Sequence, residues 1–278
     1  MATLIQSMQN ILSQKDPLMA NETKRIVLKE FLQAYTLDFL YNHRVYRKLN
    51  FYGGTCLHIN YGLNRLSEDL DLDNSNEIDL HSLEEDLLAF FRVNIGYDEV
   101  NARSQQGERG IYRITLKFPI LYTLGLTAHR DESLNLKVEV SQHKQIAVIQ
   151  KTPTLVYGRS FVTAHFSLET MMAGKMLACL ERNFQVGNSG ITIKGRDFYD
   201  LLWFMQRKVQ PLEEKLATDG IRSYSVLSAM QVLNEKITRL RKTDLAMDLL
   251  PLFEERAFIE AWLDSFEENF RDYVKYYL

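Results

Sequence analysis

Three aspartates occupy alternate positions in the sequence DLDLD, residues 69–73. In a β-strand, alternate side chains point to the same face, so Asp69, Asp71 and Asp73 would lie close together. Their mutual repulsion is unfavourable unless a cation lies among them. Oxygen ligands in this arrangement favour a hard divalent ion, Mg²⁺ or Mn²⁺. The last of the three, Asp73, also suits a turn that ends the strand, and we expect this structural role for it.

A third carboxylate for such a site is expected on a neighbouring strand. In LNLKVEVS, residues 134–141, apolar side chains alternate with Asn135, Lys137 and Glu139. This pattern predicts a strand with one apolar and one charged face. We expect Glu139 to complete the metal site with Asp69 and Asp71, the alternative being a solvated strand residue. Two metal ions held in this way can clamp a triphosphate, activate an attacking hydroxyl and stabilise the departing pyrophosphate.

Two adjacent glycines, Gly53 and Gly54, precede the aspartates. They follow a short strand-like segment, residues 49–52, and come before TCLHINYG, which predicts a short helix that ends at Gly62. Backbone N–H groups at a helix N-terminus bind phosphate oxygens, and glycine leaves room for their approach. Together with the aspartates, this arrangement predicts nucleotidyl transfer from an NTP.

The same residues resemble the signature of a known family. The pattern GGTxL followed by RxSxDLDL is made by Gly53, Gly54, Thr55, Leu57, Arg65, Ser67, Asp69 and Asp71. It is similar to the signature of the AbiEii/AbiGii nucleotidyltransferase toxins of the DNA polymerase β-like superfamily. The segments GKMLACLER and KGRDFYDLLWF resemble later motifs of that family, which contribute Lys175 and the pair Arg196 and Asp197. The resemblance extends from residue 50 to the region of residue 205.

This resemblance implies a polymerase-β-like nucleotidyltransferase domain and a toxin of a toxin-antitoxin or phage-defence pair, with a cognate antitoxin as a partner. Related toxins add nucleotides to the 3′ end of tRNA, so RNA is the expected acceptor. The resemblance also implies catalytic roles for Lys175 and Asp197. The nucleotide-binding residues that it implies are Gly53, Gly54, Thr55, Arg65, Ser67 and Lys175.

Three of these residues have structural alternatives. Arg65 and Ser67 can brace the loop before the aspartate strand instead of contacting phosphate. Lys175 falls on the apolar stripe of its predicted helix, so its ammonium group must extend to the surface or meet an anion. We expect Lys175 to reach the NTP phosphates across a cleft between two domains, with Asp197 orienting it. The alternative is a simple ion pair with Asp197, itself a candidate N-cap of the next helix.

The hydrophobic periodicity predicts an α+β protein. Residues 22–48 have the spacing of one or two helices, residues 79–95 that of an amphipathic helix, and residues 110–119 the alternation of a second strand. Further helices are predicted at residues 167–183, 197–208, 211–218, 223–240 and 254–277. We therefore predict a nucleotidyltransferase domain with a mixed sheet and N-terminal helices over residues 1–165, followed by a helical bundle domain over residues 166–278.

The composition narrows the class of protein. A net charge of −3 excludes a globally basic nucleic-acid binder, although the clusters YNHRVYRK, KGRDF and KITRLRK favour RNA binding. Two cysteines, no signal peptide and no membrane-spanning segment indicate a cytoplasmic protein without a membrane partner. The alternatives to RNA are a small-molecule or protein acceptor, or a non-catalytic binding module on the same fold.

Overall fold

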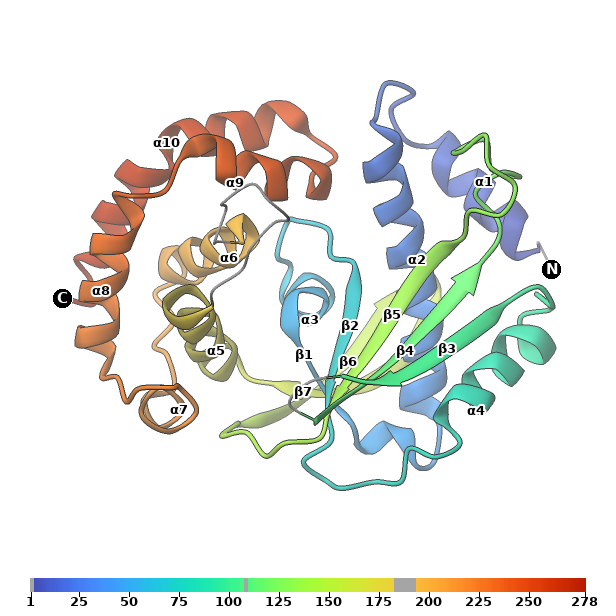
Figure 1. Cartoon of the computed structure of the whole chain (residues 1–278), viewed down its shortest axis with the longest axis horizontal. Helices are drawn as coiled ribbons and strands as arrows, with labels where there is room; N and C mark the ends of the chain where they lie inside the picture. The colour runs from blue at the N-terminus through green and yellow to red at the C-terminus, as the bar shows by residue number, and fades with distance from the viewer. Residues whose placement is uncertain (1–2, 108–109, 183–193) are drawn as a thin grey trace. The chain divides into compact units, whose positions relative to one another are not determined.

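The computed structural model describes residues 3–107, 110–182 and 194–278 (Figure 1). The chain forms two compact units, one of residues 1–144 and 150–165 and one of residues 145–149 and 166–278, which are described separately. The predicted domain boundary at residue 165 stays a prediction, because compactness does not show that either unit folds alone. Within the described residues, every helix is too short or too polar to cross a bilayer.

The first unit is built on a mixed sheet, which confirms that part of the predicted fold. Its helical segments are α1 (Leu4–Ser13), α2 (Asn21–Asn42), the 3₁₀ turn η1 (Tyr46–Lys48), α3 (Gly53–Tyr61), α4 (Leu83–Ala89) and the π-turn η2 (Phe90–Asn94). Its strands are β1 (Asn50–Tyr52), β2 (Asp69–Asp73), β3 (Asn101–Gln106), β4 (Ile111–Phe118), β5 (Leu134–Ser141), β6 (Ile149–Val156) and β7 (Arg159–Phe166). They lie in the order β3-β4-β5-β2-β1-β7-β6. The pairs β2/β5 and β1/β7 are parallel, and the pairs β1/β2, β3/β4 and β4/β5 are antiparallel.

Strict alternation in β4 and β5 gives this sheet one apolar face. The apolar residues of β5, namely Leu134, Leu136, Val138 and Val140, are all buried. Helix α2 packs against β5, and α4 packs against β3 (Figure 1). Each buried Leu or Val contributes about 1.5–3 kcal/mol. A register slip of one residue would bury the charged side chains instead, so this face fixes the register of the sheet.

Helix α3 connects β1 to β2 and carries the glycine pair at its N-terminus. It begins at Gly53, whose φ is 79°, and is followed by Gly62, whose φ is 72°. Both values lie in the left-handed region that glycine adopts without strain. The predicted short helix ended by Gly62 is confirmed. Because α3 packs against β1 and β2, its first residues lie beside the aspartates of β2.

The second unit is helical in its described residues. Its helices are α5 (Leu168–Glu181), α6 (Gly195–Gln206), α7 (Glu213–Thr218), α8 (Val226–Ile237), α9 (Lys242–Leu249), the 3₁₀ turn η4 (Leu250–Leu252) and α10 (Arg256–Val274). Helix α5 packs against α6, α7 and α8, and α6 packs against α9 and α10. The predicted connection NSG, residues 188–190, lies outside the described residues.

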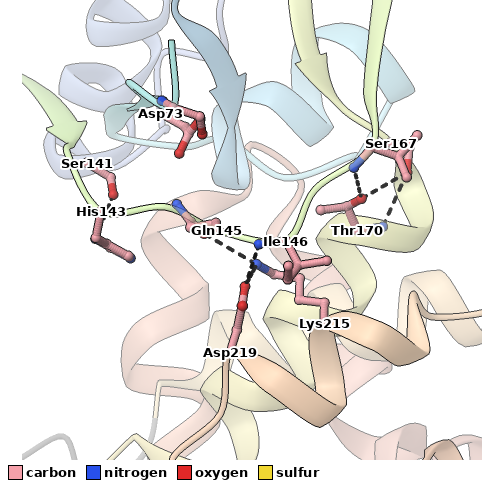
Figure 2. A network of polar contacts seen from close by, with 11 residues as sticks. Asp73, Ser141, His143, Gln145, Ile146, Ser167, Thr170, Lys215 and Asp219 are labelled. Atoms are coloured by element: carbon pink, nitrogen blue, oxygen red, sulfur yellow. Dashed lines mark hydrogen bonds and ion pairs between the residues drawn. The ribbon is translucent and has the colours of Figure 1, made fainter. Parts of the chain in front are cut away.

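Residues 145–149 belong to this second unit because a polar network fixes them to its helices (Figure 2). The Ile146 amide donates to Asp219 Oδ2 at 3.1 Å, and Lys215 Nζ lies 2.6 Å from the same oxygen. Lys215 Nζ also donates to Gln145 Oε1 at 3.4 Å. Lys215 is only 4% exposed, so Asp219 both neutralises a buried ammonium group and holds the segment.

Several elements differ from the predicted ones. The helix predicted at residues 79–95 begins only at Leu83 and continues as the π-turn η2 from Phe90. Helix α9 and strand β3 were not predicted, and no separate strands were predicted at β6 and β7. The helices α5, α7, α8 and α10 lie within the ranges predicted for them.

Candidate active site

Asp71 and Gly53 are in direct contact at the N-terminus of α3. A Cβ atom at position 53 would lie 2.1 Å from Asp71 Oδ2, a distance that no side chain tolerates. The glycine therefore has two functions here, because it adopts a positive φ and also leaves room for the carboxylate. The tight packing fixes the Asp71 side chain beside the first turn of α3.

Gly54 is in similar contact with the two polar residues of the loop before β2. A Cβ atom there would lie 2.7 Å from Arg65 Nη2 and 2.8 Å from Ser67 Oγ. Arg65 is 2% exposed, and its Nη1 donates to the Leu66 carbonyl at 2.9 Å. This burial favours the bracing role for Arg65 over direct phosphate contact, because a ligand in solvent would not reach the guanidinium group.

Thr55 and Asp69 form a third link between α3 and β2. The Thr55 hydroxyl, which is buried, donates to the Asp69 carbonyl at 2.6 Å. The hydroxyl thus anchors the start of the strand and does not point toward solvent. The polar and glycine residues of the signature therefore form one packed group around the α3 N-terminus. They are Gly53, Gly54, Thr55, Arg65, Ser67, Asp69 and Asp71.

The Asp69 carboxylate lies in a partly buried position near two cations, Lys137 and Lys29. Burial raises its pKa above the ordinary value of 3.8, Lys137 opposes the shift, and the carboxylates Glu68 and Glu139 reinforce it. Lys137 Nζ lies 3.9 Å from Asp69 Oδ1. An ionised Asp69 is therefore incompletely neutralised by the protein, which is the condition under which a bound cation is favoured.

Glu139 is the register partner of Asp71 on β5, as Lys137 is of Asp69. Residues paired across strands share a face, so the three predicted carboxylates lie on the same side of the sheet. The Glu139 side chain accepts a hydrogen bond from Arg113 Nε at 2.6 Å. In this conformation, no three His, Cys, Asp or Glu side chains are gathered as a metal site within the described residues. The donor chemistry of Asp69 and Asp71 fits a hard divalent cation, and Glu139 would join them after leaving Arg113.

Asp73 has the structural role expected of it. Its carboxylate is fully buried, accepts from Asn50 Nδ2 at 3.0 Å and from the Ser75 amide at 3.1 Å, and is also hydrogen-bonded to the Ser75 hydroxyl. The Asx-type bond to Ser75 ends β2 in a turn. Asp73 therefore belongs to the end of the strand, while Asp69 and Asp71 stay the predicted metal ligands.

Lys175 in the second unit lies between two aspartates of α6. Its Nζ atom is 2.8 Å from Asp197 Oδ1 and 2.7 Å from Asp200 Oδ2. Arg182 Nη1 lies 2.8 Å from the other oxygen of Asp197. The lysine and both aspartates are largely enclosed, with side-chain exposures of 16% for Lys175, 5% for Asp197 and 0% for Asp200. The ion pair given above as the alternative for Lys175 is present, and its predicted role at the NTP phosphates stays a prediction. The sequence interpretation missed Asp200, which follows Asp197 at helical spacing.

The Asp197 carboxyl is held ionised by this cluster. Burial by itself raises its pKa, but Lys175 and Arg182 outweigh burial and lower the pKa from 3.8 to about 2. Asp197 is not the N-cap of α6, so that prediction is wrong. The helix begins at Gly195 after Lys194, and Asp248 Oδ2 accepts from the Arg196 amide at 2.9 Å instead. Asp248 reaches the helix N-terminus from α9, a tertiary contact that sequence spacing does not show.

The basic cluster KITRLRK is mostly engaged within the second unit. Lys236 Nζ donates to the Cys179 carbonyl at 2.6 Å and so caps the C-terminus of α5. Arg241 pairs with Asp244 at 2.8 Å, and Lys242 is ion-paired with Asp264. Two of the four cations that favoured RNA binding here, Arg241 and Lys242, are therefore neutralised by carboxylates of the protein itself.

Comparison with known proteins identifies the family of this chain. A family described as "Nucleotidyl transferase AbiEii toxin, Type IV TA system" matches residues 38–277. A crystal structure of a candidate nucleotidyltransferase from H. pylori is similar in fold, with 18% identity, a TM-score of 0.50 and coverage of 90% of this chain and 92% of that chain. The structure of JHP933 from Helicobacter pylori gives 18% identity, a TM-score of 0.46 and coverage of 91% and 90%. No curated protein matches the sequence.

Proposed function

This chain belongs to the AbiEii nucleotidyl transferase toxin family, and we propose that it transfers NMP from an NTP to a hydroxyl group of RNA in a reaction that requires Mg²⁺ or Mn²⁺. The nucleotidyltransferase activity follows from the family, which matches 240 of the 278 residues, from 38 to 277. The metal requirement and the RNA acceptor are our proposals.

The contact between Gly53 and Asp71 is the observation that carries the proposal. It joins the helix N-terminus that suits a triphosphate to the carboxylate that suits its metal ion. Neither feature alone would identify the chemistry, because aspartates on strands and glycines at helix ends both have common structural roles. Asp71 Oδ2 takes up the space that a Cβ atom of residue 53 would need. The glycine at position 53 thus allows the carboxylate to lie against the first turn of α3.

Each part of the group then has a chemical role. Asp69 and Asp71, with Glu139, would hold the metal ions, which when bound neutralise the phosphates and lower the pKa of the attacking hydroxyl. The first N–H groups of α3 would bind phosphate oxygens, and Gly53 and Gly54 leave the room that Asp71, Arg65 and Ser67 occupy beside them. Thr55 fixes α3 to β2 by its bond to the Asp69 carbonyl.

Lys175 and Asp197, which belong to the second unit, are the residues to which the family resemblance assigns further catalytic roles. As a toxin of a toxin-antitoxin pair, the protein would act in the cytoplasm on tRNA or another RNA, be controlled by a cognate antitoxin and contribute to phage defence. An alternative acceptor is a small molecule or a protein side chain.

Incubation of the purified protein with each α-labelled NTP, Mg²⁺ and total cellular RNA tests this function. Incorporation of label into RNA that disappears with Asp71→Asn and on addition of EDTA is the expected result. Label found only in protein or small molecules would select the alternative acceptor. Absence of labelled product with every NTP and acceptor, from protein shown to be folded, would refute the transferase proposal.

A further inference from the structure

The strand register places the proposed metal-binding aspartates at one end of a continuous polar surface. Residues in register on β2, β5, β4 and β3 form rows across the sheet. Because paired residues share a face, each row lies on one side. The rows of this polar sheet face are Asp71, Glu139, Arg113 and Gln105; Asp69, Lys137, Thr115 and Arg103; and Asn135, Lys117 and Asn101.

Every side chain of these three rows is polar and none is buried, whereas in the next row on the same face Asp73 and Ser141 are buried and Ile111 is apolar. The intervening residues, such as Leu70, Val138 and Ile114, form the buried face. The six residues of the polar sheet face that are exposed are Asn101, Arg103, Gln105, Lys117, Asn135 and Lys137. A sheet needs only one covered face to be stable, so the other remains available for a ligand.

The charge of this surface is opposite to that of the whole chain. Strands β3, β4 and β5 contribute four cations, Arg103, Arg113, Lys117 and Lys137, against the single carboxylate of Glu139, whereas the chain has a net charge of −3. Among the described residues, neither Arg103 nor Lys117 has a carboxylate within ion-pair distance. The exposed cations of α9 and α10, by contrast, are ion-paired, as Lys242 with Asp264 and Arg256 with Glu260.

We infer that the polar sheet face binds the sugar-phosphate backbone of an RNA acceptor and leads its reactive hydroxyl to Asp69 and Asp71. This inference rests on the proposed function, which it deepens by assigning the acceptor a surface. Adjacent strands are spaced by about 4.8 Å, so β3 lies roughly 14 Å from β2. Double-stranded DNA has one phosphate per strand for about every 3.4 Å of helix axis, so a nucleic-acid backbone that crosses a surface of this width places more than one phosphate on it.

On strands β3, β4 and β5 this face has no aromatic side chain on which a base could stack, although Tyr52 of β1 is the register partner of Asp71. Its donors are guanidinium, ammonium and amide groups, which suit phosphate and ribose oxygens. Recognition there is therefore independent of base sequence. A protein or small-molecule acceptor would not need cations distributed over three strands.

The double variant Arg103→Gln, Lys117→Gln tests this surface without altering a proposed metal ligand or its contacts. Lys151→Gln is the matched control, because Lys151 is an exposed lysine on β6, the opposite edge strand, which is also three strands from β2. The measurements are binding of fluorescently labelled unfractionated tRNA as a function of salt, and the KM values for RNA and for NTP. Thermal melting confirms that all variants are folded.

The double variant is expected to bind tRNA on the order of tenfold more weakly. The slope of the logarithm of its association constant against the logarithm of the salt concentration is expected to be less negative by about 1.4. Its KM for RNA rises while its KM for NTP is unchanged, and Lys151→Gln behaves as wild type. Unchanged RNA binding in the double variant, or an equal loss in Lys151→Gln, would overturn the surface and leave the proposed function standing. Wild-type protein that uses NTP but binds no RNA would also overturn it. Binding that depends on Arg103 and Lys117 without any nucleotide transfer would support the surface and refute the proposed function.

Discussion

Asp71 Oδ2 lies 2.1 Å from the position that a Cβ atom of residue 53 would occupy. Any side chain at residue 53 would therefore displace the Asp71 carboxylate. We expect Gly53→Ala to displace the Asp71 carboxylate and to abolish nucleotide transfer. The clash and the positive φ together are expected to lower the free energy of unfolding by about 2–4 kcal/mol. Urea denaturation and the transfer assay measure the two effects.

Gly62→Ala is the matched control for this variant. Gly62 also has a positive φ, 72°, and belongs to the other end of α3, but a Cβ atom there would meet nothing within 4 Å. We expect the free energy of unfolding of Gly62→Ala to fall by only about 1 kcal/mol, from backbone strain, and the variant to keep its transfer activity. If Gly53→Ala transferred nucleotide as well as Gly62→Ala and wild type, contact between residue 53 and Asp71 would not be needed for transfer.

The raised pKa of Asp69 predicts a dependence of stability on pH and on metal. A carboxyl whose pKa is raised in the folded state stabilises the fold below its unfolded pKa, near 3.8, and loses that contribution as pH rises through the folded value. Metal-free wild-type protein is therefore destabilised at neutral pH by ionised Asp69. Asp69→Asn is expected to remove this destabilisation and to abolish transfer, while Mg²⁺ raises the melting temperature of wild type but not of the variant.

The glycine and aspartate signature could be identified from the sequence because its residues are close together along the chain. Alternation in residues 134–141 likewise predicted β5 and its charged face, since every second residue is apolar. Neither pattern could show that Thr55 anchors the Asp69 carbonyl or that Arg65 is 2% exposed. Those properties depend on how α3 packs against β2, which is a tertiary relationship.

The missed strands lack the pattern on which the prediction depended. Strand β3, NARSQQ, is an edge strand exposed along most of its length, so it has no apolar side to reveal it. Strand β6 contains Pro153, which is tolerated because β6 is the other edge. The N-terminus of α6 is bonded by Asp248, which is 52 residues away from Arg196 in the sequence, so local capping rules placed the cap wrongly at Asp197.

His58 and Glu30 predict a second pH effect, at the middle of α3. His58 Nε2 lies 3.1 Å from Glu30 Oε2, and its Nδ1 lies 2.6 Å from the Leu63 carbonyl. Burial and the charge of Arg65 lower the pKa of His58, but Glu30 and the Leu63 carbonyl together outweigh them, so the pKa lies above 6.5. The resulting stabilisation is complete below pH 6.5 and is lost as pH rises through the folded pKa.

Glu30→Gln keeps a hydrogen-bonding oxygen for the Tyr157 hydroxyl, which bonds Glu30 at 3.0 Å, and removes only the charge. We expect the free energy of unfolding of wild type to decline more steeply than that of Glu30→Gln as the pH rises above 6.5. Parallel declines would show that the pair does not stabilise α3. Denaturation at several pH values gives the comparison.

The Lys175 cluster predicts sensitivity to acid and to loss of the lysine. The pKa of Asp197, lowered to about 2, means that its ion pairs stabilise the fold above pH 3.8 and are lost as pH falls toward 2. Lys175→Met would leave Asp197 and Asp200 enclosed without their shared ammonium group. Removal of one partner from a buried pair costs about 3–5 kcal/mol, so this variant is expected to melt early whether or not Lys175 has a catalytic role.

A second substitution distinguishes a structural from a catalytic Lys175. Asp200→Asn in the Lys175→Met background removes one of the two uncompensated charges, while Arg182 still pairs with Asp197 at 2.8 Å. We expect this double variant to regain about 1–3 kcal/mol of stability and to remain inactive, because the ammonium group that the family resemblance assigns to catalysis is still missing. Asp200→Asn alone is the control for any effect of that residue on transfer. Recovery of wild-type turnover in the stabilised double variant would show that Lys175 serves only to neutralise the aspartates of α6.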